Sequence, residues 1–305
     1  MLGATRAFLL SRWLAPFVLA VGALGVLVGA AGPRLVSDVR AGTATPRTPA
    51  AAKAPSPAMP SALPEAPTGP VVLEPVTIKP GRHPLDAFSL DDLRQLALAP
   101  PRSLGSITVG RPTRGRLLNG VELRSGPGVR VMMDDHGFGT ASTVRFILDA
   151  AAEMQERFPG APDVAVGDIS RERGGYLRPH RSHQLGLDVD VGYFYDPPAR
   201  WYTRATEKNL DRTLTWALLK ALIAQGGVEY VFMDRSVQRL LREHATASGE
   251  DPAWLDEIFE RSDKKDTLFR HTWGHLTHFH VRFYDPVAEE SGRRLEKHLR
   301  RAGKI

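Results

Sequence analysis

Alternation of apolar and polar positions predicts five short strands, and helical spacing predicts three helices among them. The strand-like runs lie at 128–133, 163–169, 186–194, 228–234 and 278–284. The helical patterns lie at 140–158, 209–227 and 250–261. Because these elements follow one another without a regular βαβ rhythm, we expect an α+β fold. Its central, mainly antiparallel sheet would be flanked by helices.

The predicted helices carry polar residues that are typical of helix starts. Thr140 or Ser142 can cap the first helix, and Asn209 is the expected cap of the second. Asp251 followed by Pro252 is a cap with proline at the first helical position, which predicts where the third helix begins.

The N-terminal part of the chain has a different pattern. Residues 14–32 are uncharged over nineteen positions and follow Arg6 and Arg12, which indicates a signal peptide or a membrane anchor over 1–35. Residues 36–72 are dominated by alanine and proline and contain few large apolar side chains. Such a segment buries too little surface to offset its ordering entropy, so we expect a disordered linker.

The remaining sequence is expected to hold one folded domain over 100–290. A poorly defined lead-in at 73–99 precedes it, and a basic tail at 291–305 follows it. An export signal followed by a linker predicts a periplasmic protein, which residues 14–32 would anchor in the inner membrane if they are not removed.

Composition excludes some kinds of chemistry. The 40 basic residues exceed the 34 acidic ones only slightly and are interspersed with them, so we expect no nucleic-acid partner. The chain contains no cysteine, which excludes a disulfide framework and a thiolate metal site. Any metal must therefore be held by histidine, carboxylate or carbonyl groups.

Histidines cluster at two places. Six of the ten lie within 180–183 and 271–280. Alternation along the last predicted strand puts His278 and His280 on one face, and Asp190 lies on a face of an earlier strand. With His183 in the turn before that strand, a His₂Asp set with one open position becomes possible, as in catalytic zinc sites. A single strand histidine is more often an ordinary hydrogen-bonded residue, but the joint clustering favours a metal site.

Three motifs together resemble a known family. They are "GDISRERGG" at 167–175, "HRSHQLGLDVD" at 180–190 and "WGHLTHFHVR" at 273–282. This set is similar to that of the penicillin-insensitive murein endopeptidases, which belong to a wider group of zinc peptidases. The resemblance spans roughly residues 100 to 286.

The resemblance implies a set of zinc ligands and a general base. Carried over residue by residue, it makes His183, Asp190 and His280 the ligands of one Zn²⁺ per chain. His278 then matches the general base, which is not needed as a ligand. The central sheet would therefore carry the zinc site.

Further residues have less defined roles. His180 and His275 match additional active-site histidines of the family, with substrate binding or transition-state stabilisation as the implied roles. Arg173, in "RERGG", is a candidate for contacting an oxyanion or a substrate carboxylate.

The implied function is zinc-dependent hydrolysis of D-alanyl-meso-diaminopimelate cross-links in peptidoglycan. Two alternatives stay open. One is a D,D- or L,D-carboxypeptidase with the same zinc chemistry, which would need a closed pocket for a free carboxylate. The other is a non-catalytic zinc-binding module of the cell wall, against which the retention of His278 argues.

Overall fold

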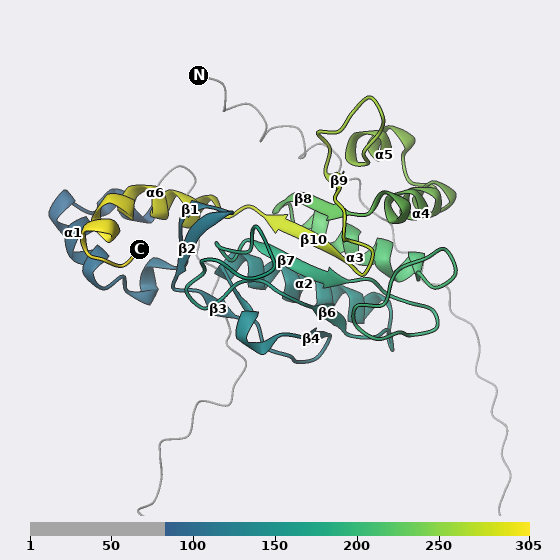
Figure 1. The fold of residues 1–305 in the computed structure, drawn as a ribbon, viewed down its shortest axis with the longest axis horizontal. Coiled ribbons are helices and arrows are strands. Elements are labelled where there is room, and N and C mark those ends of the chain that lie inside the picture. The colour runs from purple at the N-terminus through teal and green to yellow at the C-terminus, as the bar shows by residue number, and fades with distance from the viewer. Residues whose placement is uncertain (1–82) are drawn as a thin grey trace, which may run out of the picture. The chain divides into compact units, whose positions relative to one another are not determined.

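A six-stranded sheet forms the centre of the structure (Figure 1). The computed structural model describes residues 83–305, which belong to one structural unit. In spatial order the strands are β4 (Val129–Val131), β6 (Val164–Val166), β7 (Asp188–Gly192), β10 (His278–Phe283), β8 (Val228–Met233) and β9 (Phe269–His271). The three central pairings are antiparallel and the two outer ones are parallel. The expected α+β class with a mainly antiparallel sheet is confirmed.

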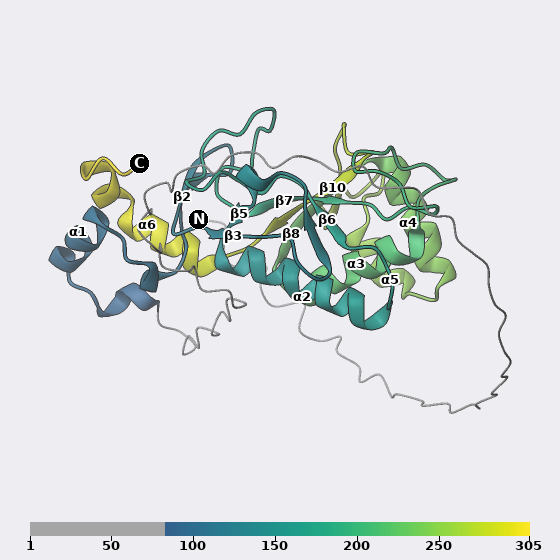
Figure 2. The same ribbon diagram turned by 90° about the horizontal axis from the view of Figure 1, so that it is seen from below.

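The two faces of the central strands have different roles. Val189 and Val191 of β7, with Phe279 and Val281 of β10, are fully buried in the main apolar core. That core also holds side chains of α2 (Ala141–Arg157) and α3 (Arg212–Ala224). Figure 2 shows these helices on one side of the sheet and long loops on the other. Because side chains alternate along a strand, the intervening polar residues point toward the loop side.

Helix starts are set largely by the expected caps. The Thr140 side chain accepts a hydrogen bond from a backbone N–H in the first turn of α2, and Asp251 caps α5 (Pro252–Ile258). The expectation that Asn209 caps α3 is wrong, because Asp211 accepts the hydrogen bond from Leu214 N instead. Asn209 is occupied in a turn, where its side chain accepts from Thr206.

A smaller region joins the two ends of the described chain. It consists of α1 (Leu90–Leu98), the hairpin β1–β2 (Ile107–Arg111, Arg114–Leu118) and α6 (Pro286–Arg301), and we call it the hairpin region. Its own apolar cluster includes Leu85, Ile107 and Leu295, all nearly inaccessible to solvent. Residues from the expected lead-in and tail therefore pack together, and the expected boundaries at residues 100 and 290 fall inside folded structure.

The remaining elements are short or were not foreseen. Helix α4 (Arg235–Ala247) is capped by Asp234, whose side chain accepts a hydrogen bond from Ser236 N. Two short strands, β3 (Val121–Glu122) and β5 (Phe138–Gly139), form a separate antiparallel pair. Single 3-10 turns lie at Pro84–Ala87, Arg102–Leu104 and Asp134–His136.

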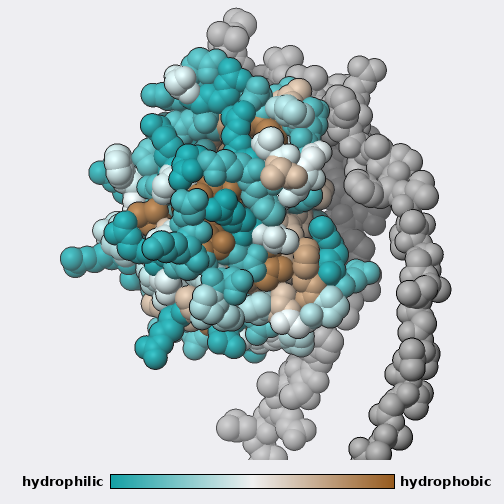
Figure 3. Space-filling model, turned by 90° about the vertical axis from the view of Figure 1, so that its right-hand side faces the viewer, coloured by the Kyte–Doolittle hydropathy of each residue, from teal (hydrophilic) through white to brown (hydrophobic). Residues whose placement is uncertain are grey.

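The end of the molecule near α4 and α5 has a mostly polar surface. Figure 3 shows hydrophilic residues dominating the coloured part of this face, with apolar residues in small separate patches. Within residues 83–305, no helix combines the length and apolar character needed to cross a bilayer. The expected signal or anchor over 1–35, the linker over 36–72 and the first part of the lead-in lie outside the described residues.

Candidate metal centre and active site

Strand register brings the two sequence clusters together. In the antiparallel pairing of β7 with β10, His280 lies directly opposite Asp190, and Arg282 lies opposite Asp188. Opposed residues on one face of a sheet have Cβ atoms about 5 Å apart. Residues ninety positions apart in sequence therefore face a common point.

His183, Asp190 and His280 present three atoms at nearly equal separations. His183 Nε2 lies 3.3 Å from Asp190 Oδ1, and His280 Nδ1 lies 3.2 Å from the same oxygen. The two ring nitrogens are 3.1 Å apart. Tetrahedral zinc with bonds of about 2.0–2.1 Å to its ligands would separate these atoms by about 3.3 Å. The triangle therefore has the dimensions of three ligands around one zinc ion.

Hydrogen bonds at the outer ring atoms orient both histidines. His183 Nδ1 donates to the backbone carbonyl of Ile169 at 2.9 Å, which leaves the Nε2 lone pair directed at Asp190. His280 Nε2 lies 2.8 Å from Asp188 Oδ1, so its Nδ1 faces the same point. Metal-binding histidines commonly use their second nitrogen in this way, which fixes the ring and raises its basicity.

Asp190 has the features of a carboxylate that lacks its partner cation. It is 1 % exposed, and both of its side-chain oxygens lack a hydrogen bond within the described part of the chain. A buried, unsatisfied carboxylate is costly unless a cation compensates it. Burial alone would raise the pKa of Asp190, but the nearby rings of His183 and His280 lower it well below its usual value. The donor set therefore fits a divalent metal.

The backbone at His183 is strained. Its φ angle of 63° lies in the left-handed region, which non-glycine residues seldom adopt. The same ring is completely buried and hydrogen-bonded to Ile169. Strain of this kind persists only where surrounding contacts enforce it, and it concentrates at functional sites.

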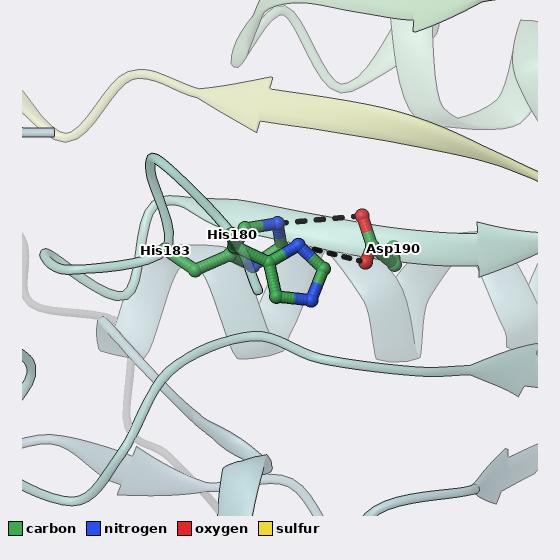
Figure 4. Close-up of side chains that lie close together, drawn as sticks. All are labelled: His180, His183 and Asp190. Atoms are coloured by element: carbon green, nitrogen blue, oxygen red, sulfur yellow. Dashed lines mark ion pairs between the residues drawn. The ribbon is translucent and has the colours of Figure 1, made fainter. Parts of the chain in front are cut away.

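His180 lies beside His183 and faces the other carboxylate oxygen of Asp190 (Figure 4). Its Nδ1 lies 3.7 Å from Asp190 Oδ2, whereas His183 faces Oδ1. His180, His183 and Asp190 also form a group whose ligand atoms lie close enough to hold a metal ion. The second nitrogen of His180 is hydrogen-bonded to Asp168 Oδ2 at 2.9 Å.

Asp168 links His180 to a further histidine. Its other oxygen lies 2.6 Å from Nδ1 of His136. Burial works to lower the pKa of His180, but the hydrogen bond to Asp168 and the charge of Asp190 outweigh it and raise the pKa. This arrangement favours a protonated imidazole beside the metal centre.

His278 and His275 lie on the loop side of the same centre. His278 Nε2 is 3.7 Å from Asp190 Oδ1, and the rings of the two histidines are 5.0 Å apart. Burial, followed by the positive charge of neighbouring histidines, lowers the pKa of His278 to about 4 despite the opposing effect of Asp190. A neutral imidazole with a free nitrogen can accept a proton at pH 7.

His275 is oriented by its own loop. Its Nδ1 donates to the backbone carbonyl of Trp273 at 3.2 Å, so Nε2 is left as the accepting nitrogen. Burial and the charge of His280 lower the pKa of His275. The ring is therefore neutral near pH 7 and presents an acceptor.

The structure places Arg173 apart from the histidines. Its exposed side chain lines a cavity of about 580 Å³, together with residues of β2 and Lys304. The lining of this cavity includes none of the histidines. A role for Arg173 at the reacting bond therefore has no contact to support it among the described residues.

The sequence patterns assigned no role to several residues that support the site. Asp188 accepts hydrogen bonds from both His280 and Arg282. Strand alternation puts all three residues on the site face, so the sequence pattern could have indicated that Asp188 supports the site. Asp168 belongs to the "GDIS" motif and follows a strand, although nothing in the sequence specified its partners. His136 is a lone histidine in "DDHG", and no spacing pointed to it.

The sequence matches the family of penicillin-insensitive murein endopeptidases over residues 108–301. The chain belongs to this family. The resemblance seen in the three motifs is thereby confirmed, and the match continues through α6.

Relatives with this name are moderately similar. The penicillin-insensitive murein endopeptidase of Klebsiella pneumoniae subsp. pneumoniae is 27% identical over 182 residues, which is 53% of this chain and 60% of that protein. That of Haemophilus influenzae is 30% identical over 145 residues, or 42% of this chain and 46% of that protein. The chain thus spans about half the length of the curated relatives it matches.

Proposed function

We propose that the chain is a zinc-dependent murein endopeptidase that hydrolyses D-alanyl-meso-diaminopimelate cross-links of peptidoglycan in the periplasm. The observation that carries this proposal is the triangle of His183 Nε2, Asp190 Oδ1 and His280 Nδ1, with sides of 3.1 to 3.3 Å. Membership in the murein endopeptidase family and the names of the relatives support the substrate.

In this proposal His183, Asp190 and His280 hold one zinc ion. When bound, zinc supplies a Lewis acid that acidifies water and polarises the scissile carbonyl. Asp188 keeps the His280 ring in place through the bond of 2.8 Å, and Arg282 in turn holds Asp188. This outer layer keeps the ligands ordered before substrate arrives.

His278 moves the proton. Its Nε2, which lies on the Asp190 side of the ring, accepts a proton from the attacking water and returns it to the leaving amine nitrogen. The Nδ1 atom, 2.9 Å from Thr277 Oγ1, then carries the hydrogen that fixes the tautomer. The lowered pKa of His278, about 4, keeps the acceptor free at neutral pH.

His180 stabilises the negative charge that develops on the scissile carbonyl, and His275 binds the substrate. His180, whose raised pKa favours the protonated ring, donates to the oxyanion that develops at the scissile carbonyl. His275 presents an accepting nitrogen and receives a hydrogen bond from a substrate amide. Asp168 positions His180 for this role through the 2.9 Å bond.

The deciding experiment is digestion of purified cross-linked muropeptide dimers by the zinc-loaded chain, with products identified by mass. We expect two monomers whose summed mass exceeds that of the dimer by one water. A chelator should stop the reaction and added zinc should restore it. Release of a single terminal D-alanine would indicate a carboxypeptidase instead. Absence of any product from protein that holds zinc would indicate a wall-binding module.

A further inference from the structure

A cavity separate from the histidine cluster lies against the hairpin region. This cavity has a volume of about 580 Å³, which is within the range of about 300–1,000 Å³ that is usual for small-ligand sites. It is lined by Pro100, Arg102, Arg116, Leu117, Leu118, Asn119, Gly120, Glu172, Arg173 and Lys304. We call it the arginine cavity.

The charge of the arginine cavity is unbalanced. Its lining has the four cationic side chains of Arg102, Arg116, Arg173 and Lys304 but only one carboxylate, Glu172. Within residues 83–305, none of these four cations forms an ion pair. Like charges that line a concave surface reinforce one another's potential and attract an anion.

Some arginines elsewhere in the described part of the chain are held by carboxylates. Arg242 and Arg261 share Asp256, and Arg294 contacts both Asp86 and Glu290. Unlike these examples, the cavity arginines have no carboxylate partner among residues 83–305, and what distinguishes them is that three of them line one cavity.

The arginine cavity is connected to the metal centre through one short segment. Leu117 N donates to the carbonyl of Arg173 at 3.1 Å, and Gly175 N donates to the carbonyl of Gln184 at 3.1 Å. Gln184 directly follows His183. The Arg116 guanidinium lies so close to Gly175 that a Cβ there would be 1.8 Å from Nη1. Backbone at 173–175 thus spans from the cavity wall to the histidine-bearing loop.

We propose that the arginine cavity binds a free carboxylate of the wall stem peptide while the cross-link lies at the metal centre. The proposal rests on the proposed function, which supplies the substrate. It adds the site in the protein that anchors this substrate. Guanidinium groups bind carboxylates through two parallel hydrogen bonds, which gives direction as well as charge. Arg102, Arg116 and Arg173 supply three such groups in one cavity.

The first test measures anion binding without turnover. Calorimetric titration of the full-length, zinc-loaded chain with glutarate should show binding that Arg116→Gln weakens about ten-fold, as expected for the loss of one charge-assisted contact. Arg111→Gln is the matched control, because Arg111 is exposed on the same hairpin but does not line the cavity. Equal affinity in all three proteins would overturn the proposal, since the anion would then bind elsewhere.

The second test identifies which oxyanion the cavity prefers and connects it to the substrate. Inorganic phosphate, titrated in parallel, should bind more weakly than glutarate; the reverse order would overturn the assignment to a carboxylate.

In dimer cleavage, Arg116→Gln should raise KM about ten-fold for dimers with free stem carboxylates and leave KM unchanged for amidated dimers. An equal KM increase for both dimers would contradict carboxylate recognition. Failure of the wild-type chain to cleave any dimer would instead contradict the proposed function.

Discussion

The central sheet and the hairpin region are held together by different means. On the sheet, β7 and β10 bury Val189 and Phe279 on one face and crowd four ionisable groups, Asp188, Asp190, His278 and His280, on the other. In the hairpin region, α1 and α6 cover the hairpin with an ordinary apolar cluster that contains Leu295 and Leu299. The sheet buries charged groups that require a partner on one of its faces, whereas the buried cluster of the hairpin region is apolar. Changes in the two regions should therefore affect different properties.

The largest expected effect comes from the ligand triangle. Replacing His280 with alanine removes one of the three proposed ligand atoms and leaves only His183 and Asp190 of that set, so we expect loss of both zinc and dimer cleavage. Metal analysis and a cleavage assay on the same preparation measure this. His244→Ala is a matched control, because His244 lies on α4, belongs to neither the ligand triangle nor the proton-transfer group, and has its ring nitrogen 3.4 Å from Ser248 Oγ. Full zinc occupancy in the His280 variant would remove that residue from the ligand set.

Next in size is the loss of the proton-transfer group. His278→Ala should keep its zinc, because the three ligands remain, while cleavage falls by about 10²–10⁴-fold. Steady-state cleavage and zinc content, measured beside the His280 variant, separate a base from a ligand. Zinc loss in His278→Ala would make it a ligand, and near-normal turnover would exclude it from the mechanism.

A smaller effect is expected from the carboxylate behind His280. Burial tends to raise the pKa of Asp188, but the hydrogen bond and charge of His280, with His183 and Arg282, lower it. Asp188→Asn keeps the size of the side chain but removes this charge, and zinc affinity should fall about 10–100-fold. Competition with a chromogenic chelator gives the affinity. An unchanged affinity would show that Asp188 only balances the charge of Arg282.

The smallest effect on chemistry is expected in the hairpin region. Leu295→Ala removes a fully buried side chain from the smaller cluster, so the free energy of unfolding should fall by about 2–5 kcal/mol. Denaturant unfolding measures this, and zinc content at low temperature should stay at one per chain. Zinc loss from the folded variant would show that the two regions are not independent.

Local patterns made most of the sheet and the site predictable. The five expected strands all enter the central sheet, because alternation along each strand directly reflects its two faces. His183, Asp190 and His280 were predicted to converge, and the register of β7 against β10 provides the reason.

The parts that sequence did not predict depend on long-range contacts. Leu85 and Leu299 lie more than two hundred residues apart but share one cluster, and neither segment alone has a pattern that specifies the other. The expected basic tail has charged residues at seven of its fifteen positions, so its sequence does not mark the buried Leu295 and Leu299 of α6 as a core face. His136 reaches Asp168 only because the loops fold together.

The proposed zinc ligands are His183, Asp190 and His280. Anomalous scattering at the zinc absorption edge, measured on crystals of the zinc-loaded chain, locates the metal without reference to activity. We expect one peak, about 2.0–2.2 Å from each of His183 Nε2, Asp190 Oδ1 and His280 Nδ1. A peak bonded to His180 in place of His280, or no peak between β7 and β10, would contradict this assignment.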